Sequence, residues 1–472
     1  MRFVLHKHLL LIALLITASY ASARDLAEIL RSSAMNNPEI LEAQANQAVS
    51  QAALEQARAA RYPTVQATAN QPMINTMSNS HQFTPGLKAN WTLYDFGKIS
   101  ADIKRGEVEE QYYGYKLNEK SDEWAYKLAG YYLEALYAKM QLEAAKDNLA
   151  LHNHIVSQLK IINQYDPGRR SELTQAEARL VKVQESIVSY ERTLGLSLRK
   201  IARYVQPAVG AAELTDPFTK LSAQDLLEQY PLTDERLTKN SSYLAQEKEL
   251  QRNQANLEIA KRARYPSIDV QAQADRKDAA VYLTMSIDVF DRKKAPAITE
   301  QQYRISAAKA QMDQLVDNLK QQAELAIIDM QKNRAQIDIA DRQIAALQQV
   351  VVDYEDQFKI ATRTLLNVVD AYGELAGAKM SKVSAQYQLM LAKLEYLSAV
   401  GGLSRWAQMP ELYRSNTQKS PTATFYPPEP LILTSYDVSK ETETKQNFVS
   451  VDQNGDLIII QQPSAASAVK KQ

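Results

Sequence analysis

The stretch Leu54–Pro63, LEQARAARYP, decides the fold, because the chain repeats it as LEIAKRARYP at Leu257–Pro266. Seven of the ten positions are identical, and both copies end in Arg-Tyr-Pro. Proline ends a helix and forces the residue before it into an extended conformation. Each copy therefore predicts a helix that passes directly into a strand.

Two further matches in the same order indicate an internal duplication. LYDFGK at Leu93–Lys98 corresponds to VFDRKK at Val289–Lys294, and SELTQA at Ser171–Ala176 corresponds to LNVVDA at Leu366–Ala371. Both halves therefore share one plan, in which a helix is followed by two strands, a very long helix and one more helix.

Proline positions and hydrophobic periodicity predict the bounds of these elements. The first repeat, 24–207, is expected to hold a β-hairpin at about 64–94, a long helix at about 98–165 and a helix at about 171–204. The second repeat, 222–405, is expected to hold a β-hairpin at about 267–290, a long helix at about 296–360 and a helix at about 366–402. A linker at 208–221 joins them.

The two ends of the chain differ from the repeats. A basic segment, the apolar run Leu9–Ile16 and the site Ala21–Ala23 form the pattern of a secretory signal peptide over residues 1–23. The apolar run is shorter than the roughly 20 residues that a membrane-spanning helix needs. Residues 406–472 are rich in proline, serine, threonine and glutamine, and are predicted to be a largely disordered extension with one candidate strand at Asp456–Ile460.

Composition excludes several classes of function. The chain has 472 residues, with 55 basic against 55 acidic side chains and no cysteine. The balanced charge provides no attraction for nucleic acid, and the missing cysteines exclude thiolate metal sites and disulfides. His152 and His154 lie two apart on a predicted helix and so do not share a face. We therefore predict no enzyme activity, no cofactor and no metal site.

Two proline-free stretches, 86–166 and 297–409, predict very long helices. As one helix, residues 98–165 would be about 100 Å long at 1.5 Å per residue. In the second stretch apolar residues recur every seven positions, which predicts a left-handed coiled coil. They are Val316, Ala323, Met330, Ile337, Ile344, Val351 and Phe358. A second apolar series lies three positions further along the same heptad, and Asn333 interrupts it. Asn333 would either set the register of the coiled coil or lie where the seam is locally hydrated.

The predicted strands alternate between polar and apolar residues. The apolar positions include Leu87, Ala89 and Trp91 in the first half and Val281, Leu283 and Met285 in the second. Strand length, alternation and an export signal together fit an outer-membrane barrel with its apolar face toward lipid. Four strands are too few to enclose a lumen, and open edges in hydrocarbon cost several kcal/mol per unpaired group. Several subunits must therefore complete one barrel.

Tyr62–Pro63 and Tyr265–Pro266 mark the two helix-to-strand transitions. Both tyrosines are placed where an aromatic belt would lie at a membrane surface. Arg61 and Arg264 next to them would either contact lipid phosphates or remain in solvent.

The stretch TRTLLNVVDAYGELAGAK at Thr362–Lys379, followed by SAVGGL at Ser398–Leu403, resembles the TolC family of outer-membrane efflux and secretion channels. The resemblance extends over roughly residues 25–405. It implies an α+β membrane protein and a homotrimer. In that trimer four strands per subunit complete one outer-membrane β-barrel, which a long periplasmic α-helical coiled-coil barrel continues.

The resemblance also implies a periplasmic gate. Two acidic residues of the family's gate correspond to Asn367 and Asp370, so that only Asp370 keeps a carboxylate. Three copies of Asp370 would form a ring that attracts cations. The alternative is that Asp370 is an ordinary surface charge of a coil.

Residues that brace the family's gate can be carried over as well. Arg363 corresponds to the bracing arginine, with Ser171 as its expected partner. Glu172 corresponds to the bracing carboxylate, but Phe358 replaces the tyrosine that meets it. The missing phenolic hydrogen bond, worth about 0.5–1.5 kcal/mol, predicts a gate that is held more loosely.

The stretch YDPGRRSEL at Tyr165–Leu173 is predicted to form the periplasmic tip. Pro167 and Gly168 form a turn between two helices. Arg169 and Arg170 would contact a periplasmic membrane-fusion adaptor, or lie in solvent.

Together with these patterns, the resemblance implies a passive exit duct in the Gram-negative outer membrane, with a large periplasmic portion. Its partners would be outer-membrane lipid, the adaptor and an inner-membrane transporter of the ABC or RND type. Type I protein secretion and multidrug efflux are the two candidate roles, and DPGRRSELTQAEARL at Asp166–Leu180 resembles ducts that serve the secretion of large adhesins. The alternative is a soluble periplasmic coiled-coil scaffold with β tips.

Overall fold

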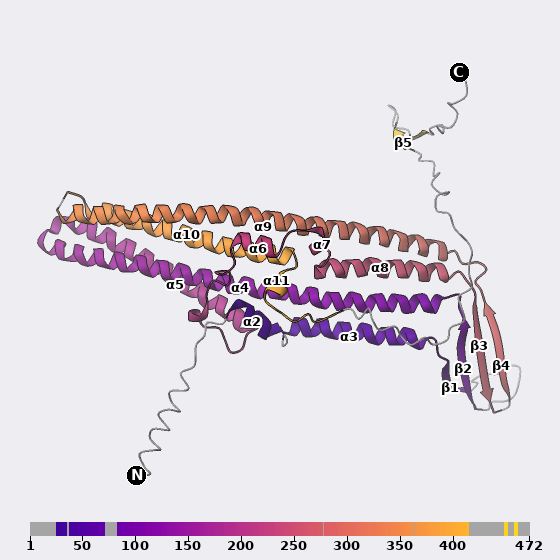
Figure 1. The fold of residues 1–472 in the computed structure, drawn as a ribbon. Coiled ribbons are helices and arrows are strands. Elements are labelled where there is room, and N and C mark those ends of the chain that lie inside the picture. The colour runs from indigo at the N-terminus through magenta and orange to yellow at the C-terminus, as the bar shows by residue number, and fades with distance from the viewer. Residues whose placement is uncertain are drawn as a thin grey trace, which may run out of the picture. The chain divides into compact units, whose positions relative to one another are not determined.

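The computed structural model describes residues 25–34, 37–70, 83–276, 278–360 and 362–414, and the strands at 448–451 and 457–460. The predicted signal peptide, and most of the first hairpin's loop, lie outside the described residues. The chain divides into two units at Lys419–Ser420. In the first unit a long bundle of helices carries a small sheet at one end (Figure 1).

The elements follow the order expected for two repeats. The first half contains α2 (Leu26–Ser33), α3 (Pro38–Ala59), β1 (Thr64–Asn70), β2 (Thr84–Tyr94), α4 (Lys98–Tyr165), the 3₁₀ turn η2 (Pro167–Arg169) and α5 (Arg170–Ala202). The linking region contains η3 (Ala211–Glu213), α6 (Ala223–Gln229) and α7 (Asp234–Leu237). The second half contains α8 (Ser241–Arg262), β3 (Ser267–Asp275), β4 (Ala279–Ser286), α9 (Lys294–Lys359), α10 (Leu365–Ala399) and α11 (Leu403–Trp406).

The second unit contains one short antiparallel hairpin, in which β5 (Phe448–Val451) pairs with β6 (Leu457–Ile460). Strand β6 lies within the candidate strand at Asp456–Ile460.

Both copies of the Arg-Tyr-Pro motif end their helices in the same way. The N–H of Tyr62 donates to the carbonyl of Ala59 at 3.0 Å, and the N–H of Tyr265 donates to the carbonyl of Arg262 at 3.1 Å. These bonds to the third preceding residue tighten the last turn, and the proline that follows has no N–H with which to continue the helix. The chain enters a strand immediately afterwards, at Thr64 and at Ser267.

The heptad positions of α9 form its packed face. Four of them are buried and three are partly buried. The buried ones are Ala323, Met330, Ile337 and Val351, and the partly buried ones are Val316, Ile344 and Phe358. The side chain of Asn333 donates to the carbonyl of Asp329 at 2.8 Å, so its amide N–H is satisfied within α9.

The linker 208–221 is bonded to the middle of the bundle. The hydroxyl of Tyr132 on α4 donates to the carbonyl of Thr215 at 3.0 Å and accepts from its N–H at 2.9 Å. The ammonium group of Lys393 on α10 donates to the carbonyl of Leu221 at 2.7 Å. Burial lowers the pKa of Lys393, and this hydrogen bond satisfies one of the donors of its buried ammonium group.

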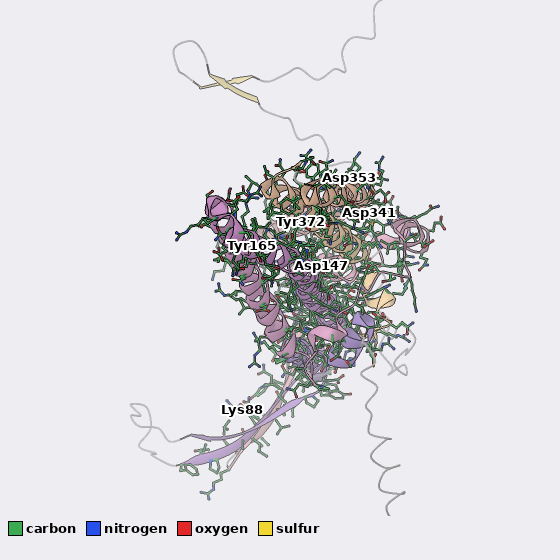
Figure 2. The ribbon with its side chains drawn as sticks, turned by 90° about the vertical axis from the view of Figure 1, so that its left-hand side faces the viewer. Lys88, Asp147, Tyr165, Asp341, Asp353 and Tyr372 are labelled. Carbon is green, nitrogen blue, oxygen red and sulfur yellow. The ribbon has the colours of Figure 1, made fainter. Side chains whose placement is uncertain are left out.

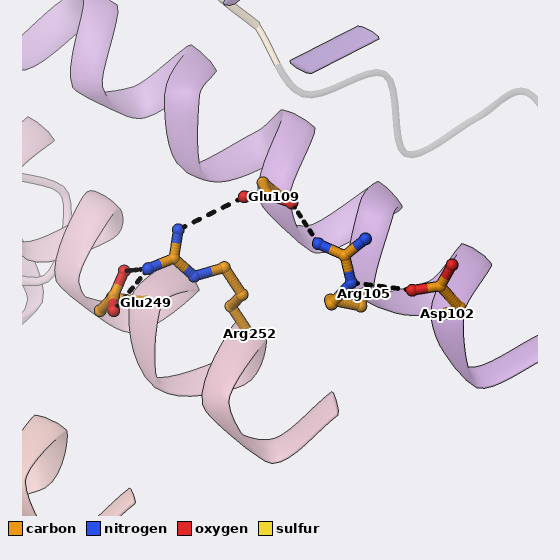
Figure 3. Close-up of polar contacts among 5 residues, drawn as sticks. All are labelled: Asp102, Arg105, Glu109, Glu249 and Arg252. Atoms are coloured by element: carbon orange, nitrogen blue, oxygen red, sulfur yellow. Dashed lines mark hydrogen bonds and ion pairs between the residues drawn. The ribbon is translucent and has the colours of Figure 1, made fainter. Parts of the chain in front are cut away.

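A charged network joins the two repeats where α4 packs against α8 (Figure 3). Glu109 on α4 lies 2.6 Å from Arg105 of its own helix and 3.6 Å from Arg252 on α8. Arg252 also pairs with Glu249 at 2.7 Å. All four side chains are largely shielded from solvent, with 21–30% of their surface exposed. The network therefore couples α4, which follows β2, to α8, which precedes β3.

From α11 onward the chain forms a strap, residues 403–414, that packs against α4. Ser404 donates its hydroxyl to the buried carboxylate of Asp122. Farther along, the backbone of Tyr413 exchanges two hydrogen bonds with the amide side chain of Asn118, at 2.9 and 3.0 Å. The predicted extension at 406–472 therefore begins with a segment that is packed against the bundle.

Gly114 provides the space in which the ring of Tyr413 lies. A Cβ atom added at Gly114 would lie 2.4 Å from carbons of that ring, which is far inside van der Waals contact. We expect Gly114→Ala to displace the strap and to destabilise the folded protein by about 1–3 kcal/mol, the range typical of overpacking. The measurement is the thermal midpoint of the helical circular dichroism signal in detergent.

Gly130→Ala is the matched control in the same helix, because an added Cβ there has nothing within 4 Å. Alanine is the better helix former, so this control should gain stability. An equal gain in Gly114→Ala would contradict the assigned role of the strap.

Candidate functional site

The sheet has one continuous apolar face. Strands β1 to β4 form an antiparallel sheet in sequence order. Residues directly opposite each other on neighbouring strands point to the same face, so the register defines rows across the sheet. One row is Val65, Ala89, Ala272 and Val281, and the next apolar row is Trp91, Val270 and Leu283.

The opposite face is polar. Its rows alternate with the apolar rows and contain mostly amide and hydroxyl side chains. They are Thr64, Asn90, Gln271 and Tyr282 in one row, Gln66, Lys88, Gln273 and Ala280 in the next, and Thr92, Asp269 and Thr284 in a third. Asp269 accepts hydrogen bonds from Thr92 at 2.6 Å and from Ser267 at 2.8 Å.

The large side chains of the apolar face are not covered by the rest of the subunit. Val65 is 69% exposed, Val281 is 74% exposed and Leu283 is 71% exposed. Soluble proteins rarely leave a contiguous apolar patch of this kind in water. None of the described helices combines the length and hydrophobicity needed to cross a lipid bilayer.

Both outer edges of the sheet are open. Within the described residues, β1 pairs only with β2 and β4 pairs only with β3. Each edge therefore presents unpaired backbone groups, which act as a template for another strand.

A β-bulge alters the alternation at the base of β2. The register passes from Thr92 opposite Asp269 to Tyr94 opposite Ile268, so that one residue is skipped. Tyr94 thereby takes the place in the apolar row that simple alternation predicts for Leu93. Only the pairing of the strands reveals this change.

Aromatic rings gather where the sheet meets the helices. The ring of Tyr94 lies 4.8 Å from that of Phe96, which stacks on Tyr265 at 5.7 Å. Tyr62, in the other copy of the motif, is 69% exposed. This position, next to Pro63 and Pro266, is the one that an aromatic belt would occupy.

At the opposite end of the bundle, α4, α5, α9 and α10 pack around a second apolar cluster. Its members include Ile155 and Leu159 on α4, Ala176 on α5, Val351 on α9, and Val368, Val369 and Tyr372 on α10. Tyr372, labelled in Figure 2, donates its hydroxyl to Glu355 on α9. Burial, together with the bond to Glu355, raises the pKa of Tyr372 well above 10.0, so the phenol keeps its proton.

Asp370 forms an ion pair between the two helical hairpins. Its carboxylate lies 2.5 Å from the guanidinium group of Arg179, which joins α10 to α5. The side chain of Asp370 is 53% exposed, and that of Arg179 is 33% exposed. Asn367, one turn earlier, accepts from the hydroxyl of Thr364 in its own segment.

Arg363 is bound within its own hairpin. Its guanidinium group donates to Gln357 at 2.7 Å and lies 3.8 Å from the ring centroid of Tyr354. Ser171 is exposed at the start of α5. The brace between Arg363 and Ser171 stays a prediction.

The remaining predicted tip residues and Glu172 lie at the turn between α4 and α5, while Phe358 lies near the end of α9. Asp166 accepts from the N–H of Gly168 at 3.1 Å and lies 3.6 Å from Arg169. Pro167, Gly168 and Arg169 form η2, and Arg170 begins α5. Glu172 lies in the first turn of α5, and Phe358 packs against the second apolar cluster. Tyr165, just before the turn, is 86% exposed (Figure 2).

Sequence reasoning assigned no role to His152, which the structure buries in α4 near Arg179. Its Nδ1 lies 3.1 Å from the carbonyl of Asn148. Burial lowers the pKa of His152 below its ordinary value of 6.5, and the charge of Arg179 acts in the same direction. The sequence offered one signal for this burial: His152 and His154 lie two positions apart on a helix, so only one of them can face the core.

This burial predicts a pH dependence. Below about pH 6.5 the unfolded chain binds a proton at His152 while the folded chain does not. The free energy of unfolding is therefore highest above that pH, and it falls as the pH drops toward the lower folded-state pKa of His152. We expect His152→Gln to remove this loss of stability between pH 7.5 and pH 5, because glutamine does not titrate. The thermal midpoint measured across this range checks it.

His154→Gln serves as the control, because His154 is exposed. It should show the same acid destabilisation as the unmodified protein. Identical pH profiles for all three proteins would rule out a role for His152.

Comparison with known proteins identifies relatives of the chain. Residues 29–205 match the family described as outer membrane efflux protein. The outer membrane efflux protein BepC of Brucella suis biovar 1 (strain 1330) is 23% identical over 339 residues, which cover 68% of this chain and 72% of BepC.

Solved structures share the fold. The outer membrane protein VceC of Vibrio cholerae aligns with a TM-score of 0.69 at 17% identity, covering 80% of this chain and 96% of VceC. The open state of the MtrE outer membrane channel of Neisseria gonorrhoeae aligns with a TM-score of 0.68 at 17% identity, covering 82% of this chain and 94% of MtrE. The predicted fold, a long helical bundle that continues a small antiparallel sheet, is confirmed.

Proposed function

We propose that this chain, which is similar to the outer membrane efflux proteins over residues 29–205, is one subunit of an exit duct in the Gram-negative outer membrane. The sheet forms part of a β-barrel, with its apolar face toward lipid and its polar face toward the lumen. The helices continue the duct into the periplasm. The observation that carries this proposal is the bare apolar face, backed by a polar face, on a sheet with two open edges.

The open edges also explain why the duct needs several copies. In hydrocarbon each unpaired backbone group costs several kcal/mol, so β4 of one subunit pairs with β1 of the next until the barrel closes. Three subunits are the number that the family resemblance implies. In the alternative, a soluble coiled-coil scaffold, the exposed side chains of Val281 and Leu283 would lie in water.

The duct itself is passive, and its energy comes from an inner-membrane transporter of the ABC or RND type. A periplasmic adaptor would contact the tip at Pro167, Gly168, Arg169 and Arg170, since this turn is the exposed end of the α4–α5 hairpin. BepC is named an efflux protein, and we therefore place efflux ahead of the type I secretion that the tip sequence favours.

Reversing the polarity of the apolar face tests the membrane assignment. Leu283→Arg places a charge toward lipid, at a cost of about 2–4 kcal/mol per subunit near the bilayer midplane. We expect this variant to lose outer-membrane fractionation, the trimer band in detergent and conductance in planar bilayers.

The neighbouring substitution Thr284→Arg is the matched control, since Thr284 lies in a polar row of the same strand. It should keep all three properties. Recovery of the unmodified mature protein as a soluble monomer would overturn the proposed function.

The ion pair at the far end makes a second prediction. Arg179→Gln leaves the Asp370 carboxylate without its counter-ion, so the cation-to-anion permeability ratio of the duct should rise about two-fold or more at low ionic strength. The ion pair is partly exposed and such pairs contribute about 0–1 kcal/mol, so the thermal midpoint should change little.

The double variant Arg179→Gln/Asp370→Asn separates charge from packing. It lacks both members of the ion pair and should return the permeability ratio to that of the unmodified duct. A ratio that stays raised in the double variant would show that Asp370 does not carry the effect.

A further inference from the structure

We propose that Lys88 determines the ion preference of the membrane part of the lumen, where its copies form a cationic ring between two acidic levels. The inference rests on the proposed function, because the polar face of the sheet becomes a lumen only if the barrel closes. It assigns a specificity-determining role to one side chain of β2.

The register places Lys88 on the polar face. Lys88 pairs with Gln66 on β1 and with Gln273 on β3, so its immediate cross-strand neighbours are uncharged amides. Along the described polar rows, the other charged residues are Asp269 and Asp275, both on β3. Each subunit therefore contributes one cation and two anions to this face.

The three charges lie at different heights along the barrel. Asp275 is opposite Gly86, two residues from Lys88, and Asp269 is opposite Thr92, four residues from Lys88 in the other direction. At about 3.4 Å per residue these separations are about 7 Å and about 14 Å along the strand. A solute that passes along the lumen therefore meets an acidic, a basic and a second acidic level in turn.

Asp269 is oriented by uncharged donors, because its carboxylate accepts from the hydroxyls of Thr92 and Ser267. Asp275 accepts from the N–H of Asp278 at 2.9 Å in the β3–β4 turn. Hydroxyl donors orient a carboxylate without cancelling its charge. The acidic level of Asp269 therefore acts on ions in the lumen.

Lys88 is free to act on passing ions. It is exposed, and the ion pairs of the described residues do not include it; Figure 2 shows it on the sheet, far from the other labelled side chains. Asp269 lies beyond the Debye length of about 8 Å at physiological ionic strength and offsets the charge of Lys88 little, whereas Asp275, about 7 Å away along the strand, lies within that length. A ring of ammonium groups attracts anions and repels cations at this level.

The test is the reversal potential of the purified duct in planar bilayers under a KCl gradient at low ionic strength. Lys88→Gln should raise the potassium-to-chloride permeability ratio about two-fold, and Lys88→Glu should raise it further in the same direction. Arg276→Gln is the control, because it removes the same charge from the β3–β4 turn, outside the paired rows. It should leave the ratio unchanged.

The outcomes separate the two proposals. If unmodified protein and Lys88→Gln both conduct with the same ratio, the role of Lys88 is overturned while the duct stands. An equal shift in Arg276→Gln would also overturn it, since the effect would then follow net charge instead of position. Absence of conductance from the unmodified trimer would overturn the duct itself.

Discussion

Backbone hydrogen bonding in hydrocarbon is the constraint on which the proposed duct depends. A strand in lipid has no water to satisfy its N–H and C=O groups, so every strand edge must find another strand. Strands β1 to β4 satisfy one another through the pairings β1–β2, β2–β3 and β3–β4, and the outer edges of β1 and β4 stay open. The duplication supplies the two hairpins, and the α4–α8 network couples the helices attached to them. In the proposed duct, further copies of the chain pair with the two open edges.

The two ends of the bundle are held by different chemistry. Near the sheet, side chains such as Glu109 and Arg252 join the repeats through charges that are largely shielded from solvent. At the far end, an apolar cluster packs the four long helices together, and the more exposed pair of Arg179 and Asp370 adds a link between the hairpins. An exposed ion pair forms and breaks at little cost in free energy. The far end is therefore the part of the structure best suited to rearrangement.

Sequence patterns predicted the elements well, because those elements depend on local interactions. Pro63 and Pro266 end their helices through the missing N–H, whatever the rest of the chain does. Alternation in β1 to β4 separates an apolar from a polar face, and it too is a property of one segment that does not depend on the rest of the chain. The contacts around the predicted gate residues were anticipated less completely. Asp370 was singled out, but its partner Arg179 is 191 residues away in the chain and belongs to no motif.

By itself, then, the sequence determined the duplication, the lengths of the helices, the helix-to-strand transitions and the two-faced strands, since each follows from spacing along one segment. Only the tertiary structure decided the strand register, the bulge that places Tyr94 in an apolar row, the burial of His152 and the packing of the Tyr413 ring against Gly114. Those features arise where segments distant in the chain meet. Their geometry depends on which side chains pack together in space, and the periodicity of a single segment cannot predict that packing.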